Sequence, residues 1–369
     1  MSYSRRKFLL LAGATSLSTI VANKLLAQGI PQEILNQVLP LPGKYGENYG
    51  KAKIRAFHLH NQPKTSPLHQ TLEEMWLEVF KQSDGELFIS PIPEDAHIPA
   101  GDPQAVHFIT NGRFEVVSVA APILDKLSPD AIAIQNLPFI YKSADEVFDV
   151  IDKPLFAEAL NNSVAQYNLI YLPNGTFDNG IRNVTSVASK PINKVEDFKD
   201  LIIRIPPSND IAMTMKALGA IPQQFTMNQV FEVLKNRTVE AQENPMSVAK
   251  GFKLYEVTKY LNLTGHAWSG YNTFFNTTFW NSLSPTTQNI IKEVLPVYQL
   301  KQRKAQAEYN QQAFKELTED KGMIALTPDT SEVPKKLIPI YQSIYNRLNP
   351  SARSLVKDLL EAKTGVKFD

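Results

Sequence analysis

The hydrophobic pattern over residues 53–92 predicts a β-α-β unit near the start of the chain. The segment "KIRAFHLH" (53–60) alternates polar and apolar residues as a strand does. In "SPLHQTLEEMWLEVFKQSDG" (66–85) the apolar residues recur at helical spacing, with Ser66 as a suitable N-cap and Gly85 beyond the last turn. The apolar segment "ELFISPI" (86–92) follows as a second strand. This order favours a parallel sheet covered by helices.

Helices and strands alternate along much of the remaining chain, which predicts the α/β class. The expected elements are a helix and a strand separated by Gly112 within 105–122, a helix from Ser143, strands over 167–173, 201–205 and 238–245, helices ending at Gly219 and covering 227–236, and a β-rich segment over 260–280. Residues 176–192 are expected to be extended chain and then a loop. Because 369 residues exceed what one hydrophobic core usually serves, two domains are predicted.

One long helix is predicted over residues 284–322. Ser284 is a suitable N-cap, Pro285 fits the first turn, and Gly322 ends the pattern. A helix of this length would reach about 50 Å, which is enough to lie across two domains. Pro296 is expected to kink it.

The N-terminus has the pattern of an export signal over residues 1–27. A basic start is followed by a modest apolar stretch and by Ala27, after which cleavage is expected. Arg5 and Arg6, followed by "KFL", resemble the twin-arginine signal of bacteria, although an ordinary secretory signal with incidental arginines is the alternative. Residues 28–50 are expected to form a linker. The mature protein is therefore predicted to be soluble and periplasmic, without stable membrane insertion.

Composition excludes several classes of function. A formal net charge of +1 gives no indication of nucleic acid or an anionic membrane as a partner. The absence of cysteine excludes disulfides, thiolate nucleophiles, cysteine-ligated zinc and lipoprotein anchoring. No P-loop, G-x-G-x-x-G or G-x-S-x-G motif occurs, so no cofactor and no catalytic residue is predicted. Acidic residues are scattered, and paired-carboxylate catalysis stays open.

His58 and His60 are the only candidate metal ligands that the pattern brings together. Strand alternation places both on one face, as a metal site can require. No acidic or histidine partner lies close in sequence, and a polar strand end is the structural alternative. A twin-arginine-exported metallo-enzyme using these histidines and a distant carboxylate is therefore the rival functional hypothesis.

Arg204 is the strongest candidate functional residue because it interrupts a buried apolar run, residues 201–205. A buried, unpaired charge costs several kcal/mol, on the order of the penalty per ion in real proteins. As a structural residue, Arg204 would need Asp197 or Asp200 as an internal partner. As a functional residue, its planar guanidinium could bind a ligand carboxylate through two parallel bonds. Arg182 is a second basic residue on what is expected to be neighbouring chain.

Five segments carry a family resemblance. They are "DNGIRNVTS", "DFKDLIIRIP", "MKALGAIPQQ", "VFEVLKNRTVEAQENP" and "YEVTKYLNLTGHAW". In this order and spacing the chain resembles the extracytoplasmic solute-binding protein of a TRAP transporter (tripartite ATP-independent periplasmic, DctP type). The resemblance runs from about residue 53 to about residue 325 and is densest over 178–280.

The resemblance implies a two-domain periplasmic binding protein fold of the α/β class, with hinge strands and a long helix spanning both domains. The implied domains are 51–178 with 270–305, and 179–269 with 306–369. It also implies that a carboxylate ligand is bound in the cleft and delivered to membrane permease subunits, without catalysis. A binding module that feeds a sensor instead is the alternative.

The resemblance assigns ligand-binding roles to particular positions. Arg204 matches the arginine that forms the family's carboxylate salt bridge, Arg182 a second ligand-contacting arginine, Asn244 an asparagine bonded to the same carboxylate, Met227 the place of an aromatic residue, Asn61 a contact after the first strand, and Trp268 a position close to the cleft. The chain departs from the family pattern at Gln229, Asp200, Glu240 and Ala241, and around Asp102. The departures near Met227 bear on the ligand more than on the fold.

Overall fold

The computed structural model describes residues 50–98, 100–127 and 129–369. The predicted export signal (1–27) and all but the last residue of the predicted linker (28–50) lie outside the described residues.

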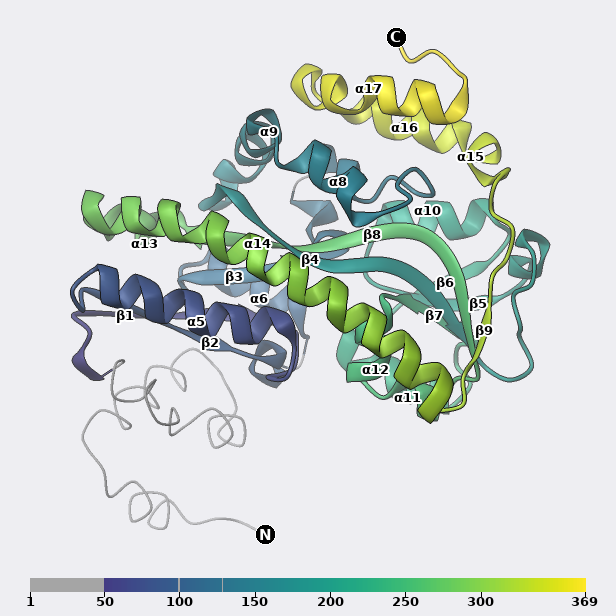
Figure 1. Ribbon diagram of the computed structural model, residues 1–369. Helices are drawn as coiled ribbons and strands as arrows, with labels where there is room; N and C mark the ends of the chain where they lie inside the picture. Colours follow the sequence, from purple (N-terminus) through teal and green to yellow (C-terminus); the bar gives the residue numbers. More distant parts are fainter. Residues whose placement is uncertain (1–49, 99, 128) are drawn as a thin grey trace.

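One mixed sheet runs through the molecule (Figure 1). Its strands are β1 (Ile54–His60), β2 (Leu87–Ile92), β3 (Val116–Ala120), β4 (Leu169–Ser186), β5 (Ile202–Ile205), β6 (Ile221–Gln224), β7 (Ala241–Asn244), β8 (Tyr260–Asn276) and β9 (Ile324–Leu326). Their order is β2-β1-β3-β8-β4-β7-β5-β6, with β9 paired to β8. The parallel β1–β2 pair joined by a helix confirms the β-α-β unit predicted from the sequence.

The two long strands β4 and β8 pass through both halves of this sheet. At one end of the pair Leu169 lies opposite Asn276, beside β3; at the other end Ser186 lies opposite Tyr260, beside β7. Between these ends the pairing shifts register, as bulges that bend strands do. The result is a two-domain periplasmic binding fold: a first lobe around β1–β3 and a second lobe around β5–β7, joined by crossing strands.

Helices cover both faces of the sheet. They are α5 (Pro67–Gln82), α6 (Asp102–Thr110), α7 (Pro129–Gln135), α8 (Ala144–Ile151), α9 (Pro154–Val164), α10 (Asn209–Ala217), α11 (Val230–Lys235), α12 (Met246–Gly251), α13 (Thr277–Ser282), α14 (Pro285–Lys315), α15 (Val333–Lys336), α16 (Ile338–Arg347) and α17 (Pro350–Thr364). Short 3-10 turns include η1 (Glu94–His97), η2 (Ala121–Lys126) and η5 (Met227–Gln229). In the first lobe, Phe57 and Leu59 pack in one apolar cluster and Ala56 in a second, with residues of α5 and α14.

The predicted long helix is α14, which runs diagonally across the molecule in Figure 1. It packs against α5 of the first lobe and α12 of the second, so it spans both lobes as expected. The helix continues through Pro296, and the kink there stays a prediction. In the described part of the chain, no helix is both long enough and apolar enough to cross a bilayer.

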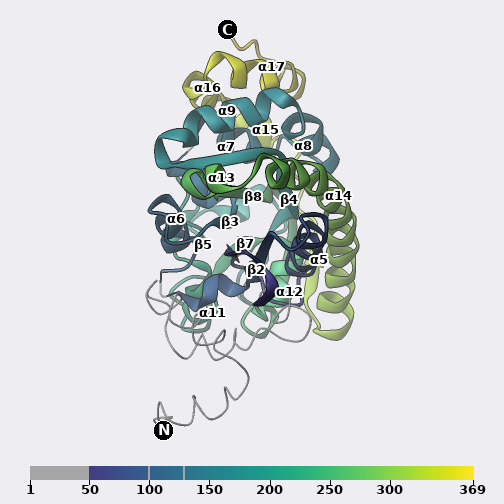
Figure 2. The same cartoon turned by 90° about the vertical axis from the view of Figure 1, so that its left-hand side faces the viewer.

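The strand expected over residues 167–173 is the first part of a longer strand, β4. Residues 176–192 were expected to be extended chain and then a loop, and β4 continues to Ser186, where it pairs with β7 and β8, before the chain leaves the sheet. The C-terminal helices α16 and α17 pack on α7 and α9 (Figure 2), which belong to the predicted first domain. The proposed boundaries, which assign 306–369 to the second domain, stay a prediction, and these contacts favour moving α16 and α17 to the first.

Replacing Gly270 by alanine is expected to destabilise the crossing of β4 and β8. An added Cβ would lie 2.1 Å from Cη2 of the buried Trp268 ring and 2.8 Å from the carbonyl oxygen of Phe177. Overpacking of this kind costs about 1–3 kcal/mol, so a lower melting temperature is expected. Gly251→Ala in α12 is the matched control, since its nearest neighbour would lie at 3.7 Å. Equal melting temperatures for the two variants would contradict the prediction.

Candidate functional site

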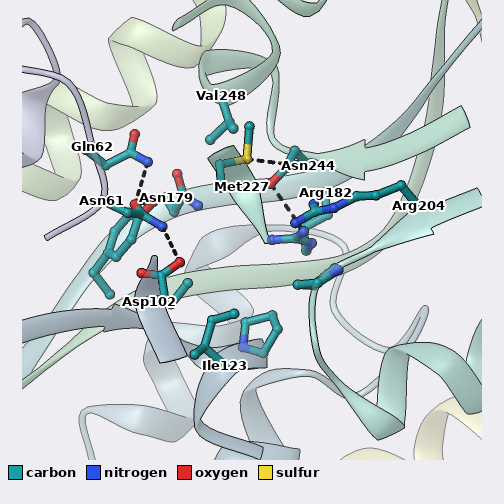
Figure 3. A pocket seen from close by; sticks show the side chains of 14 residues that line it. Asn61, Gln62, Asp102, Ile123, Asn179, Arg182, Arg204, Met227, Asn244 and Val248 are labelled. Carbon is teal, nitrogen blue, oxygen red and sulfur yellow. Dashed lines mark hydrogen bonds between the residues drawn. The ribbon is translucent and has the colours of Figure 1, made fainter. Parts of the chain in front are cut away.

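A pocket lies where the two lobes and the crossing strands meet, and about 380 Å³ of space there, including the part open to solvent, is not filled by protein atoms. Its walls are formed by Asn61, Gln62, Asp102, Ala120, Pro122 and Ile123 from the first lobe, Asn179, Arg182 and Tyr271 from the crossing strands, and Arg204, Pro206, Met227, Asn244 and Val248 from the second lobe. Figure 3 shows Asn61 and Asp102 on one side of the pocket and the two arginines on the other.

Arg204 reaches the pocket from β5, a short strand held between β6 and β7. Its side chain is 2% exposed, and Nε and Nη2 donate to the carbonyl oxygen of Phe225 at 2.9 and 2.5 Å. Among the described residues, no carboxylate forms a hydrogen bond or ion pair with Arg204, and its Nη1 has no partner. The internal partners considered from the sequence, Asp197 and Asp200, therefore do not neutralise it.

The surroundings of Arg204 favour binding of an anion. Burial lowers its pKa to about 9; Glu243 opposes this shift, Arg182 adds to it and Asp102 opposes it. The guanidinium stays protonated at neutral pH, but it holds its charge at a cost in free energy. A bound anion would remove this cost.

Arg182, in contrast, already has an internal counter-charge. Its Nε and Nη2 donate to the two carboxylate oxygens of Glu243 on β7, at 2.5 and 2.7 Å, and His266 Nε2 lies 3.0 Å from the same carboxylate. Burial alone would raise the pKa of Glu243, but the charge of Arg182 and the hydrogen bonds from His266 and Arg182 lower it to about 2. Only Nη1 of Arg182 remains without a partner among the described residues, so Arg182 can contribute one donor to a ligand.

Asn244 and Met227 lie together on the second-lobe wall. Asn244 Oδ1 accepts from Arg182 Nη2 at 3.2 Å, and its Nδ2 donates to Gln242 Oε1 at 2.6 Å. Nδ2 also lies 3.9 Å from the sulfur of Met227. The amide is thus oriented by protein groups, and Met227 lines the pocket beside it.

Asn61 directly follows the first-lobe strand β1 and lines the pocket, but most of its amide is already used. Its Oδ1 accepts from Tyr271 Oη at 3.0 Å and Gln62 Nε2 at 2.9 Å, and its Nδ2 donates to Asp102 Oδ2 at 2.8 Å. Asp102, the first residue of α6, was noted from the sequence only as lying where the chain departs from the family pattern. The acid directly after a glycine, "GDP", is the signal that could have drawn attention to it.

Trp268 does not line the pocket, which corrects its predicted place near the ligand. It is fully buried, its indole nitrogen donates to Asp178 Oδ1 at 2.8 Å, and its ring packs edge-on against Phe148. The reason is strand alternation: Trp268 lies opposite Ile181 in the β4–β8 pair, so it faces away from the side that Arg182 occupies.

The histidine pair does not form the metal site of the rival hypothesis. Both ring nitrogens of His58 are hydrogen-bonded, to Ser118 and Trp76. His60 likewise contacts His69 through Nε2 and the backbone amide of Gln62 through Nδ1. Within the described ranges, no group of three or more His, Asp or Glu side chains could hold a metal ion. Through Trp76 and His69, these contacts join β1 to helix α5, which is a structural role.

Comparison with known proteins shows which family the chain resembles. The model of the family described as bacterial extracellular solute-binding protein, family 7 (DctP) matches residues 58–348. The sialic acid-binding periplasmic protein SiaP of Vibrio cholerae is 28% identical over 229 residues, covering 62% of this chain and 67% of SiaP. The C4-dicarboxylate-binding protein DctB of Bacillus subtilis is 25% identical over 288 residues, covering 77% and 79%.

Solved structures agree on the fold. The sugar acid binding protein DctPAm of Advenella mimigardefordensis, in complex with galactonate, superposes with a TM-score of 0.76 at 24% identity, over 85% of this chain and 99% of that chain. A TRAP periplasmic solute-binding protein of Shewanella oneidensis with bound succinate gives 0.74 at 22% identity, over 85% and 98%. The chain described here therefore belongs to the DctP family of extracellular solute-binding proteins, the solute-binding components of TRAP transporters.

Proposed function

We propose that this protein captures a small carboxylate-containing molecule between its two lobes in the periplasm. It then delivers the molecule to a TRAP-type permease in the membrane. The observation that carries the proposal is Arg204, a buried guanidinium facing the pocket with no carboxylate partner among the described residues. A planar guanidinium matches a carboxylate through two charge-assisted bonds, and a matched pair is far less costly to bury than a lone ion.

The remaining pocket residues fit the same role. Nη1 of Arg182 can donate to the same carboxylate, Asn244 is held beside Arg182, and Met227 offers apolar surface to the ligand's carbon atoms. Asn61 can offer its second amide hydrogen from the opposite lobe. Binding both lobes at once would favour the closed arrangement, as ligand-driven domain closure requires.

The relatives support a carboxylic acid as the class of ligand. The names of SiaP and DctB refer to sialic acid and C4-dicarboxylates, and the two solved structures contain galactonate and succinate. No catalytic step is part of the proposal. A sensor in place of the permease stays the alternative, and adjacent genes for two permease subunits would favour the permease.

A thermal-shift screen of the purified mature protein tests the proposal. Gluconate, galactonate, glucuronate, succinate and orotate are compared with neutral amides such as gluconamide and succinamide. An acid at one hundred times its dissociation constant should stabilise the protein by about 2.7 kcal/mol, whereas its amide should not. Equal shifts from acid and amide, or no shift from a broad panel of acids, would overturn the carboxylate assignment.

A further inference from the structure

The wall opposite the arginines is formed by an oriented chain of hydrogen bonds that ends on a carboxylate. Tyr271 Oη donates to Asn61 Oδ1, and Asn61 Nδ2 donates to Asp102 Oδ2. Every donor in this chain points toward Asp102, which is 4% exposed and lines the pocket. The chain therefore presents an acceptor, and not a donor, at its end.

A second buried acid, Asp95, interacts with Asp102. Asp95, in η1, is 3% exposed, and burial, the charge of Asp102 and a hydrogen bond with Asp102 all raise the pKa of Asp95. Burial also raises the pKa of Asp102, to about 6. The hydrogen bonds from Asn61 and Asp95 and the charge of Arg204 act in the opposite direction and limit this rise. Two interacting carboxyl groups disfavour each other's ionisation, and with a pKa of about 6 Asp102 carries a negative charge at neutral pH.

Groups of opposite charge thus lie on opposite sides of the pocket. Arg204, with its unpartnered Nη1, lies on one side and Asp102 on the other (Figure 3), and neither a hydrogen bond nor an ion pair joins them in the described residues. A ligand that places a carboxylate on Arg204 would extend its other end toward Asp102. A second carboxylate there would face a buried negative charge, and such like-charge contacts cost several kcal/mol, roughly.

Amide side chains complete the lining beside this acid. Asn61, Gln62, Asn179 and Asn244 all line the pocket and offer both donors and acceptors. Hydroxyl groups also both donate and accept, so they match amides and can donate to Asp102. Each of these amides already bonds to a protein group, but Asn61, Gln62 and Asn179 each keep a second amide hydrogen, which an apolar tail would leave without a partner.

From this arrangement we propose that Asp102 selects a hydroxylated monocarboxylic acid, with the carboxylate on Arg204 and a hydroxyl group donating to Asp102, and that it rejects dicarboxylates of the same length. The inference rests on the proposed function and narrows its class of ligand.

Matched pairs of acids test the inference on the wild-type protein by calorimetry at neutral pH. Gluconate and galactonate differ from glucarate and galactarate only at the end that would meet Asp102. At least one monoacid should bind about tenfold or more tightly than its diacid, because a like-charge contact costs more than one factor of ten. Hexanoate, a monoacid that lacks hydroxyl groups, should bind more weakly than gluconate or galactonate.

The variant Asp102→Asn should reverse much of this discrimination. It removes the charge but keeps the shape, so the ratio of monoacid to diacid affinity should fall about tenfold or more toward unity. Glu316→Gln breaks an ion pair with Lys250, and because neither residue lines the pocket, it should leave the ratio unchanged. Circular dichroism and melting curves verify folding, and the wild-type comparison stands even if Asp102→Asn does not fold.

The outcomes separate this inference from the proposed function. Tight binding of succinate or hexanoate without binding of any hydroxy acid would overturn the inference while supporting carboxylate capture. Wild-type affinities that are equal for diacid and monoacid, or an unchanged ratio in folded Asp102→Asn, would overturn it as well. Tighter binding of aminocaproate than of any hydroxy acid would identify an ammonium donor and contradict the hydroxyl assignment. If no acid binds, both conclusions fall together.

Discussion

The variant Arg204→Ala is expected to lose most of the affinity for the best acid found in the thermal-shift screen. Truncating one partner of a buried charge pair costs about 2–5 kcal/mol, which is on the order of thirtyfold to several-thousandfold in the dissociation constant. The loss should be large here because the side chain is 2% exposed, and its ligand carboxylate would be left without its main counter-charge. Isothermal titration calorimetry at neutral pH measures it directly.

Two further variants sharpen this test. Arg204→Lys keeps the positive charge but loses the planar fork, so its affinity should fall between those of the wild type and Arg204→Ala. Arg353 is a matched control, because its Nε and Nη2 also donate to backbone carbonyls, those of Tyr345 and Asn346, and none of these residues lines the pocket. Arg353→Ala should bind the acid as the wild type does. Unchanged affinity in Arg204→Ala would refute the assigned role.

The buried charge of Arg204 could be recognised from the sequence because its signal is local. A charge inside a short apolar run has only two physical explanations, an internal partner or an external one, and both can be written down before the structure is known. The strands and helices were predictable for the same reason: the apolar spacing and caps of α5 and α14 lie within each element. The two crossing strands were harder, since β4 continues to Ser186 through pairing with distant β7 and β8.

The rest of the site depends on contacts between residues far apart in the chain. Asp102 and Asn61 approach each other only through the packing of α6 against β3 and β8, and Glu243 reaches Arg182 only through the register of β4 and β7. The resemblance put Trp268 close to the cleft, whereas the register of β4 and β8 turns its side chain to the face opposite Arg182, and a matched position in sequence does not reveal that facing. Periodicity predicts elements, whereas register and facing decide which side chains share a pocket.

The variant Glu243→Gln is expected to lower the stability of the ligand-free protein strongly. Glu243 is fully buried and accepts from both Arg182 and His266, so its loss leaves Arg182 buried without a counter-charge. Breaking a buried ion pair in this way costs about 3–5 kcal/mol. For a chain of this size the melting temperature should fall by on the order of 5 °C or more. Urea and thermal unfolding followed by circular dichroism provide the measurement.

The pH dependence of the same variant gives an independent check. Because the pKa of Glu243 is lowered from 4.5 to about 2 on folding, its contribution is complete above pH 4.5 and is lost as the pH falls toward 2. The stability difference between wild type and Glu243→Gln should therefore be largest near neutral pH and narrow in that window. Glu316→Gln breaks a half-exposed pair with Lys250 and should cost only about 0–1 kcal/mol. If Glu243→Gln is no less stable than Glu316→Gln, Arg182 finds its counter-charge elsewhere. If the stability difference between wild type and Glu243→Gln does not change with pH, the carboxylate of Glu243 is not the counter-charge of Arg182.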